Sequence, residues 1–335
     1  MIKAINGIVS KETAIYRITT LWAFSECGLG GLMHAFKFPF TGIFVGGLSV
    51  LFITLIALNS RNLKQDIFKA LTIVLLIKLA VSPHSPIAAY FAVSLQAVLG
   101  FLIFRLFSTN LASILILTVV TFLASAIQKI IILTIIYGNS LWHAIDQYIF
   151  WVAKKLDYNT FNSETLVYLY ILIYAVSGVI VGFLIRKITT NVDKVNLEDM
   201  PKNIQPSVLK TTKGKKRNLF FFAVLLIFII IALYLSNNSN SPFSDGLYIV
   251  ARSIIVITIW YFVLSPLLFS LLRKTLTNKE TQLSIQIDKI TNFFPLLKSI
   301  FIISWNQTSH YKGLNRIEKF VSKSIAYSIN YNEIE

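Results

Sequence analysis

Long apolar runs that recur along the chain are the feature that most limits how it can fold. A helix needs about 20 mostly apolar residues to cross the hydrocarbon region of a bilayer. Because lipid cannot satisfy backbone polar groups, such runs cross it as helices, and they predict an all-α, polytopic transmembrane bundle of about eight spans. The expected spans are approximately residues 18–36, 41–60, 67–82, 86–107, 111–137, 165–185, 219–236 and 247–272.

Charge and composition agree with this interpretation. Only 14% of the residues are charged and 55% are hydrophobic, whereas about a quarter of a soluble domain is charged. The net charge of +16 would suit nucleic acid, but the Lys and Arg residues lie in loops between apolar runs. Loop cations gather on one side and leave Lys37, Lys154 and Lys155 on the other. The positive-inside rule then predicts a multi-pass protein of the cytoplasmic (inner) membrane with both termini cytoplasmic.

The polar stretch after the sixth run divides the chain. It contains "KGKKR", which we interpret as an orientation signal that contacts lipid head groups. The predicted parts are a six-span module, a basic cytoplasmic linker, a two-span module and an amphipathic cytoplasmic tail, at residues 1–187, 188–218, 219–272 and 273–335.

Periodicity predicts that the tail is helical. Phe294, Leu297, Phe301 and Trp305 fall on one helical face, and Pro295 would lie in a first turn or at a kink. Such a helix would lie on the membrane surface or dock against a cytoplasmic partner.

Glycines in the apolar runs predict close helix packing. "CGLGG" resembles a dinucleotide-binding loop only superficially, because no strand precedes it. Small residues let helix backbones approach each other in lipid, and GxxxG pairs recur in two further runs. The predicted packing glycines are Gly28, Gly31, Gly42, Gly46, Gly178 and Gly182.

Ionisable residues inside membrane spans are costly and therefore informative. Glu26, Lys78, Lys129 and Arg252 are the main ones. Lys78 lies near the outer end of its run, where it would extend its ammonium group toward the surface. An ion pair of Glu26 with Lys78 or Lys129 is the other possibility, and Lys129 beside Gln128 favours a role inside the bundle.

Enzymatic and metal chemistry are not favoured by the sequence. No two of the histidines His34, His84 and His143 have helical i, i+4 spacing, and a single cysteine allows no multi-thiolate site. Nucleophile-elbow, zinc-protease and phosphate-loop motifs are absent from the sequence. We therefore expect no catalytic residues, no metal and no cofactor, with a lipid-modifying enzyme around Glu26, His34 and His84 as a distant alternative.

Residues 140–156, "SLWHAIDQYIFWVAKKL", predict an amphipathic helix at the membrane interface. It would be a surface anchor or a lid over a pocket. Outer loops would bring Lys37, His84 and His143 together above the six-span module, which is a place where small ligands bind between helices.

The six-span module resembles the substrate-binding S component of energy-coupling factor (ECF) vitamin and micronutrient transporters. The similar segments are "AFSECGLGGLMHAF", "FPFTGIFVGG" and "KALTIVLLIKLAVSPHSPIAAYFAVSLQAVLGFLIF", over about residues 15–187. The resemblance implies a six-helix bundle that binds solute beneath its outer loops. It also implies a surface of small residues that faces a T component, here Ala23, Gly28, Gly31 and Gly42.

Two departures from that family's pattern bear on the expected solute and on the role of the second module. Its nickel and cobalt members carry histidine directly after the initiating methionine, whereas Ile2 stands here. The second module would be a shortened T component, but the only near match to an Ala-Arg-Gly signature is Ala251-Arg252-Ser253, at the start of a span.

The leading hypothesis is therefore a membrane transport component that captures a small solute and is energised by separate ATPase subunits. The alternative is a non-transporting scaffold whose cytoplasmic tail recruits a partner protein. Partners would be the solute, membrane lipids and ATPase or T-component subunits, and not nucleic acid. The candidate ligand-binding residues, whose charges lean toward an anionic solute, are His34, Lys37, His84, Gln96, Lys129 and His143.

Overall fold

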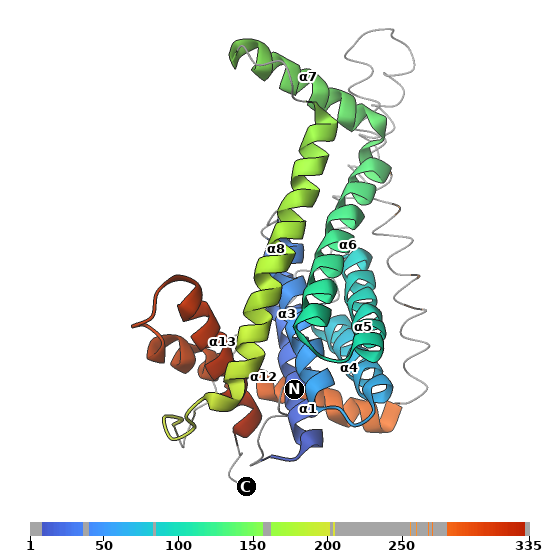
Figure 1. Ribbon diagram of the computed structural model, residues 1–335. Helices are drawn as coiled ribbons and strands as arrows, with labels where there is room; N and C mark the ends of the chain where they lie inside the picture. Colours follow the sequence, from blue (N-terminus) through green and yellow to red (C-terminus); the bar gives the residue numbers. More distant parts are fainter. Residues whose placement is uncertain are drawn as a thin grey trace. The chain divides into compact units, whose positions relative to one another are not determined.

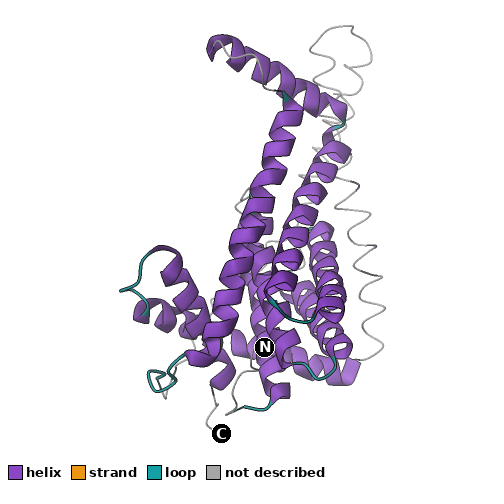
Figure 2. Ribbon diagram, viewed as in Figure 1, coloured by secondary structure: helices purple, strands orange, loops and turns teal. Residues whose placement is uncertain are grey.

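A computed structural model describes residues 9–35, 40–82, 85–156, 162–201 and 280–331, with the single positions 204, 255, 259, 267 and 270. Every regular element among these residues is a helix, and they contain no strand (Figures 1 and 2). The all-α prediction is confirmed for this part of the chain. The predicted span 219–236, and nearly all of 247–272, lie outside the described residues.

Four described helices are long and apolar enough to cross a membrane. They are α3 (Thr41–Asn59), α5 (Ile87–Phe107), α6 (Leu111–Tyr137) and α8 (Ser163–Asn191), which continues into the short η2 (Val192–Lys194). Each coincides with a span predicted from the sequence. They indicate a membrane protein, while the count of eight spans, the inner membrane and the orientation stay predictions.

The predicted spans 18–36 and 67–82 are also helical. The first corresponds to α1 (Lys11–Phe24), the π-helical segment η1 (Ser25–Leu29) and α2 (Gly30–Ala35). The second corresponds to α4 (Leu63–Val81), whose charged residues set it apart from the four apolar helices. Whether either one crosses fully stays a prediction.

Polar side chains mark where several helices begin. Ser10, Asn62 and Asn110 precede α1, α4 and α6, and each accepts the backbone N–H three residues later, at 3.2, 3.3 and 2.9 Å. The first N–H groups of a helix have no partner within it, so these caps define the starting points.

Residues 1–126, 172–209 and 276–335 form one compact unit. In it α1 packs on α3 and α4, and α5 packs on the same two helices (Figure 1). Ile18, Val50, Ile53, Val74 and Ala97 are fully buried between them. The predicted division at residues 187, 218 and 272 stays a prediction.

The tail folds back onto this unit as α12 (Glu280–Gln307) and α13 (Gly313–Asn330), which confirms its helical periodicity. Phe294 and Leu297 are buried, and Phe24 of α1 meets the Phe294 ring edge-to-face at 5.1 Å. Pro295 lies inside α12, so the first-turn alternative is wrong. The N-terminal part of the face predicted to meet a membrane or a partner is thus covered by the chain's own helices, whereas Trp305 at its other end is 45% exposed.

The second unit comprises residues 127–171 and 210–275. Its described part contains α7 (Asn139–Leu156), which confirms the helix predicted at 140–156. Gly138 has φ +69°, a left-handed conformation that ends α6 and suits glycine. The Asp146 carboxylate accepts the backbone N–H of Ser163 at 2.6 Å, and this bond holds the pKa of Asp146 below its usual range. The choice between anchor and lid stays open.

Candidate functional site

Glu26 enters the core of the first unit from an irregular stretch of helix. It lies in η1, where i→i+5 bonding interrupts the regular winding between α1 and α2. Such π-helical turns are rare, and they are frequently found at functional sites. The Glu26 side chain is 1% exposed and faces α3 and α4.

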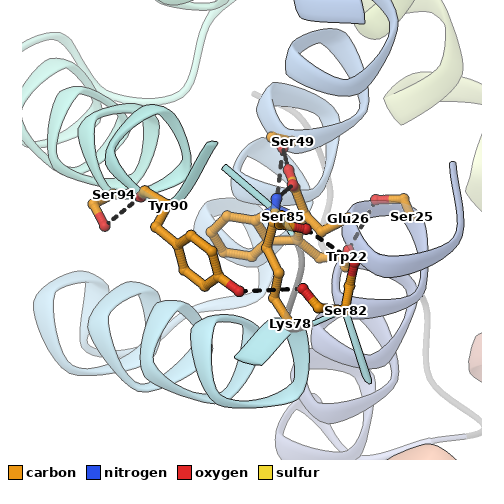
Figure 3. Close-up of polar contacts among 9 residues, drawn as sticks. All are labelled: Trp22, Ser25, Glu26, Ser49, Lys78, Ser82, Ser85, Tyr90 and Ser94. Atoms are coloured by element: carbon orange, nitrogen blue, oxygen red, sulfur yellow. Dashed lines mark hydrogen bonds and ion pairs between the residues drawn. The ribbon is translucent and has the colours of Figure 1, made fainter. Parts of the chain in front are cut away.

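Lys78 of α4 forms an ion pair with Glu26 in the interior. Its Nζ lies 2.6 Å from Glu26 Oε2, and Lys78 is also only 1% exposed (Figure 3). The prediction that this lysine reaches the surface is therefore wrong, and its pairing with Glu26 is confirmed. A buried charge is tolerated when it is paired and its remaining hydrogen-bonding positions are filled.

The second carboxylate oxygen of Glu26 is also occupied. Ser49 of α3 donates its hydroxyl to Glu26 Oε1 at 2.6 Å, and Trp22 Nε1 donates to Ser49 Oγ at 3.1 Å (Figure 3). The network thus joins α1, η1, α3 and α4 in one chain of hydrogen bonds. Because each member is buried, these bonds form in a low-dielectric setting that strengthens them.

Polar groups continue from the ion pair to the end of α4. The Lys78 ammonium lies 5.7 Å from the centre of the Tyr90 ring, a cation–π distance. Tyr90 donates its hydroxyl to the Ser82 carbonyl at 3.5 Å, and the Ser82 and Ser85 hydroxyls lie 2.9 Å apart (Figure 3). Charged and polar groups thus run from the interior to the turn after α4.

A second polar position lies one turn away along α3. A Cβ at Gly46 would lie 3.4 Å from Gln96 Nε2 of α5 and 3.7 Å from Thr121 Cγ2 of α6. Gln96 Oε1 and Thr121 Oγ1 are buried and have no hydrogen-bond partner among the described residues. Gly46 and Ser49 are three residues apart on α3, so both polar positions border the same stretch of that helix.

The predicted packing glycines fall into two groups. A Cβ at Gly178, Gly182 or Gly42 would come within 2.9 Å of α6, a distance that real Cβ atoms do not show. Gly46 is close to Gln96, whereas a Cβ at Gly28 or Gly31 would meet only ordinary contacts at 3.7 Å or more. Close packing is therefore a property of the glycines on α3 and α8.

The predicted ligand-binding residues are only partly placed by the structure. Gln96 is buried beside Gly46, while Lys129 and His143 are exposed residues of the second unit. Lys37, His84 and the His34 side chain lie outside the described residues. No group of three His, Cys, Asp or Glu residues within the described part could hold a metal ion.

Ser49 and Trp22 are site residues that sequence reasoning missed. A serine in a long apolar run and a tryptophan on a helix are each common, so neither stands out alone. Their signal was the nearby Glu26, since a buried carboxylate requires hydrogen-bond donors. No spacing rule relates a donor 23 residues away along the chain to it.

Comparison with protein families, with characterised proteins and with solved structures gives no match for this chain.

Proposed function

We propose that the chain is the integral-membrane component of a small-solute uptake transporter, energised by separate ATPase subunits. The observation that carries the proposal is the buried Glu26–Lys78 pair in a chain with four apolar, membrane-length helices. Ionisable residues at such positions are expensive, and in membrane proteins they mark pathways for substrates, ions or protons. A purely structural bundle would gain as much from apolar packing at these positions.

Within this proposal, the chain acts in the manner of an ECF S component for a vitamin or micronutrient. The proposed solute contacts are His34, Lys37, His84 and Gln96, and, separately, Lys129 and His143 of the second unit. The unpartnered Gln96 oxygen supports a polar contact at that residue. The excess of cations among these residues favours an anionic solute.

Within this proposal, the ion pair is a place where an anionic solute group could bind Lys78. An anionic group that entered the cluster would compete with Glu26 for the Lys78 ammonium, and Ser49 would still satisfy one oxygen of Glu26. Such an exchange of partners would link solute binding to a change in how η1 packs against α4. Differential contacts of this kind are what a ligand needs in order to shift a conformational equilibrium.

Ligand-induced thermal stabilisation tests the proposal directly. The thermal unfolding of the purified full chain is measured with each member of a panel of vitamins and metals. At least one compound should raise the midpoint temperature of unfolding, because a ligand that binds only the folded state stabilises it by mass action. Gln96→Leu should abolish that shift, whereas Lys69→Met, an exposed lysine on α4, should preserve it. The absence of a shift with every compound contradicts the proposal, and copurification with nucleotide-binding subunits supports it independently.

The non-transporting scaffold remains the second candidate because of one observation. Ile302, Trp305, Leu314 and Ile317 of the tail stay exposed, although Phe294 and Leu297 of α12 are buried. The scaffold predicts that truncation after Arg273 abolishes complex formation, while Lys129→Met and His84→Ala are tolerated. Affinity copurification with the full and truncated chains distinguishes the two functions.

A further inference from the structure

The connection between α12 and α13 carries an exposed apolar surface, which we call the tail tip. It consists of the side chains of Ile302, Trp305, Leu314 and Ile317, which are 51%, 45%, 62% and 43% exposed. The first two lie near the end of α12 and the other two near the start of α13. Arg316 of α13 lies over the Trp305 ring of α12, so the two helix ends are adjacent, and exposed apolar patches on proteins mark binding surfaces.

The tail tip is held in place by the rest of its unit. The Trp305 ring meets Phe320 edge-to-face at 5.2 Å, and the Arg316 guanidinium lies 3.8 Å from its centre. Glu318 of α13 is buried and accepts the Asn191 side-chain amide at 2.9 Å. The exposure of the tip is therefore a property of a packed helical pair.

Several cations belong to the same part of the chain as this apolar surface. Lys298, Lys312, Arg316 and Lys319 lie on the same two helices or at their junction, and the sequence places one carboxylate, Glu318, between residues 298 and 319. Glu318 is buried, and Lys187 of α8 approaches it at 3.5 Å. Lys319 lies 4.0 Å from Glu318, and the exposed carboxylate of Asp199 lies 3.5 Å from Lys323 of α13, so cations outnumber carboxylates at the tip.

We infer that the tail tip binds anionic lipid head groups of the membrane that holds the same chain. Cations flanking Trp and aliphatic side chains are the chemistry of interfacial lipid-binding helices, where phosphates meet Lys and Arg while apolar side chains enter the acyl boundary. Tryptophan is enriched at this depth because its ring is apolar and its N–H remains polar.

A soluble protein partner fits this surface less well. Lysine is depleted from protein–protein interfaces, whereas it flanks the apolar residues here. The bilayer is also present at high effective concentration, because the tail belongs to the same chain as the apolar helices. The inference is independent of whether the chain transports a solute, since it needs only membrane embedding.

Trp305 provides the measurement. The full chain is reconstituted into bilayers of phosphatidylcholine, alone or mixed with phosphatidylglycerol, with brominated acyl chains as fluorescence quenchers. The quenching of Trp305 fluorescence is obtained as the difference between the signals of the wild type and of Trp305→Phe. We expect quenching that rises with the phosphatidylglycerol fraction and weakens when salt screens the charges.

Charge variants separate lipid binding from folding. Lys312→Gln with Lys319→Gln should raise the phosphatidylglycerol fraction needed for half-maximal quenching several-fold, since each cation near the surface contributes to binding. The matched control, Lys64→Gln with Lys69→Gln, removes two exposed lysines from α4. It should leave the phosphatidylglycerol fraction needed for half-maximal quenching unchanged. Quenching that is absent, or equal in neutral and anionic bilayers, overturns the inference, as does an equal response of the two double variants.

Discussion

Replacing Lys78 by methionine tests the buried network most directly. The substitution keeps the length and apolar volume of the side chain but removes the ammonium that lies 2.6 Å from Glu26 Oε2. Ser49 still donates to the other oxygen, so the carboxylate keeps one of its two partners. An uncompensated charge then remains in a site that is almost fully excluded from solvent.

Lys78→Met is expected to lose a large part of the free energy of unfolding. Removing one partner of a buried ion pair reduces the free energy of unfolding by about 3–5 kcal/mol, because the remaining charge has lost its compensation. Replacing both partners with neutral groups of similar size is far less costly. Glu26→Gln combined with Lys78→Met should therefore be more stable than Lys78→Met alone, since the new amide oxygen still accepts from Ser49.

Thermal unfolding of the full chain in detergent, followed by helical circular dichroism, measures both effects. Each 1 kcal/mol lowers the midpoint by roughly 2–4 °C in a protein of moderate size, so the single variant should fall by about 10 °C. Lys69→Met, an exposed lysine on the same helix, is the control and should shift little. The reasoning is refuted if Lys78→Met matches this control or if the double variant is no more stable than Lys78→Met.

Three further predictions concern other parts of the first unit. Gly178→Ala should lower stability by about 1–3 kcal/mol, because its Cβ would come within 2.9 Å of the α6 backbone, while Gly28→Ala should be nearly neutral in the same thermal assay. Glu318→Ala removes the acceptor for Asn191 and should increase tryptic cleavage of the tail in the folded protein, with unchanged cleavage contradicting the contact. Burial raises the pKa of Tyr327 to about 12, so the difference in tyrosinate absorbance between wild type and Tyr327→Phe should appear near pH 12.

The Tyr327 prediction has a consequence for stability. The pKa of the Tyr327 hydroxyl rises from its ordinary value of 10.0 to about 12 when the protein folds. The stability that the neutral hydroxyl contributes to the folded state is therefore fully present below pH 10 and is lost as the pH rises toward 12. The packing of α13 against Gln307, which accepts the Tyr327 hydroxyl at 3.1 Å, should loosen in that window. Protease sensitivity that does not change across this range would contradict the assignment.

Much of the helical pattern could be predicted because membrane helices are encoded locally. The boundaries predicted at 41–60, 86–107 and 111–137 agree with α3, α5 and α6 to within a residue or two. An apolar run must satisfy its own backbone in lipid, so its length alone determines the element. The amphipathic helix α7 was found in the same way, from its spacing of apolar side chains.

The candidate site could be predicted only in part. Glu26 and Lys78 were identified as costly residues, and their pairing was one of two alternatives. They are 52 residues apart, so the choice between Lys78 and Lys129 depended on how the helices pack. The surface position expected for Lys78 was wrong because η1 places a carboxylate within its reach.

Apolar run length and helical periodicity are local properties, and they were enough to predict the helices of the described residues, four of which are long and apolar enough to cross a membrane. Which residues meet depends on the tertiary structure: Glu26 bonds with Lys78 and Ser49, Gln96 lies beside Gly46, and the tail packs against α1. Burial explains the difference, because a charge is stabilised by whichever partner the packed helices bring near, and packing depends on contacts far apart in the chain.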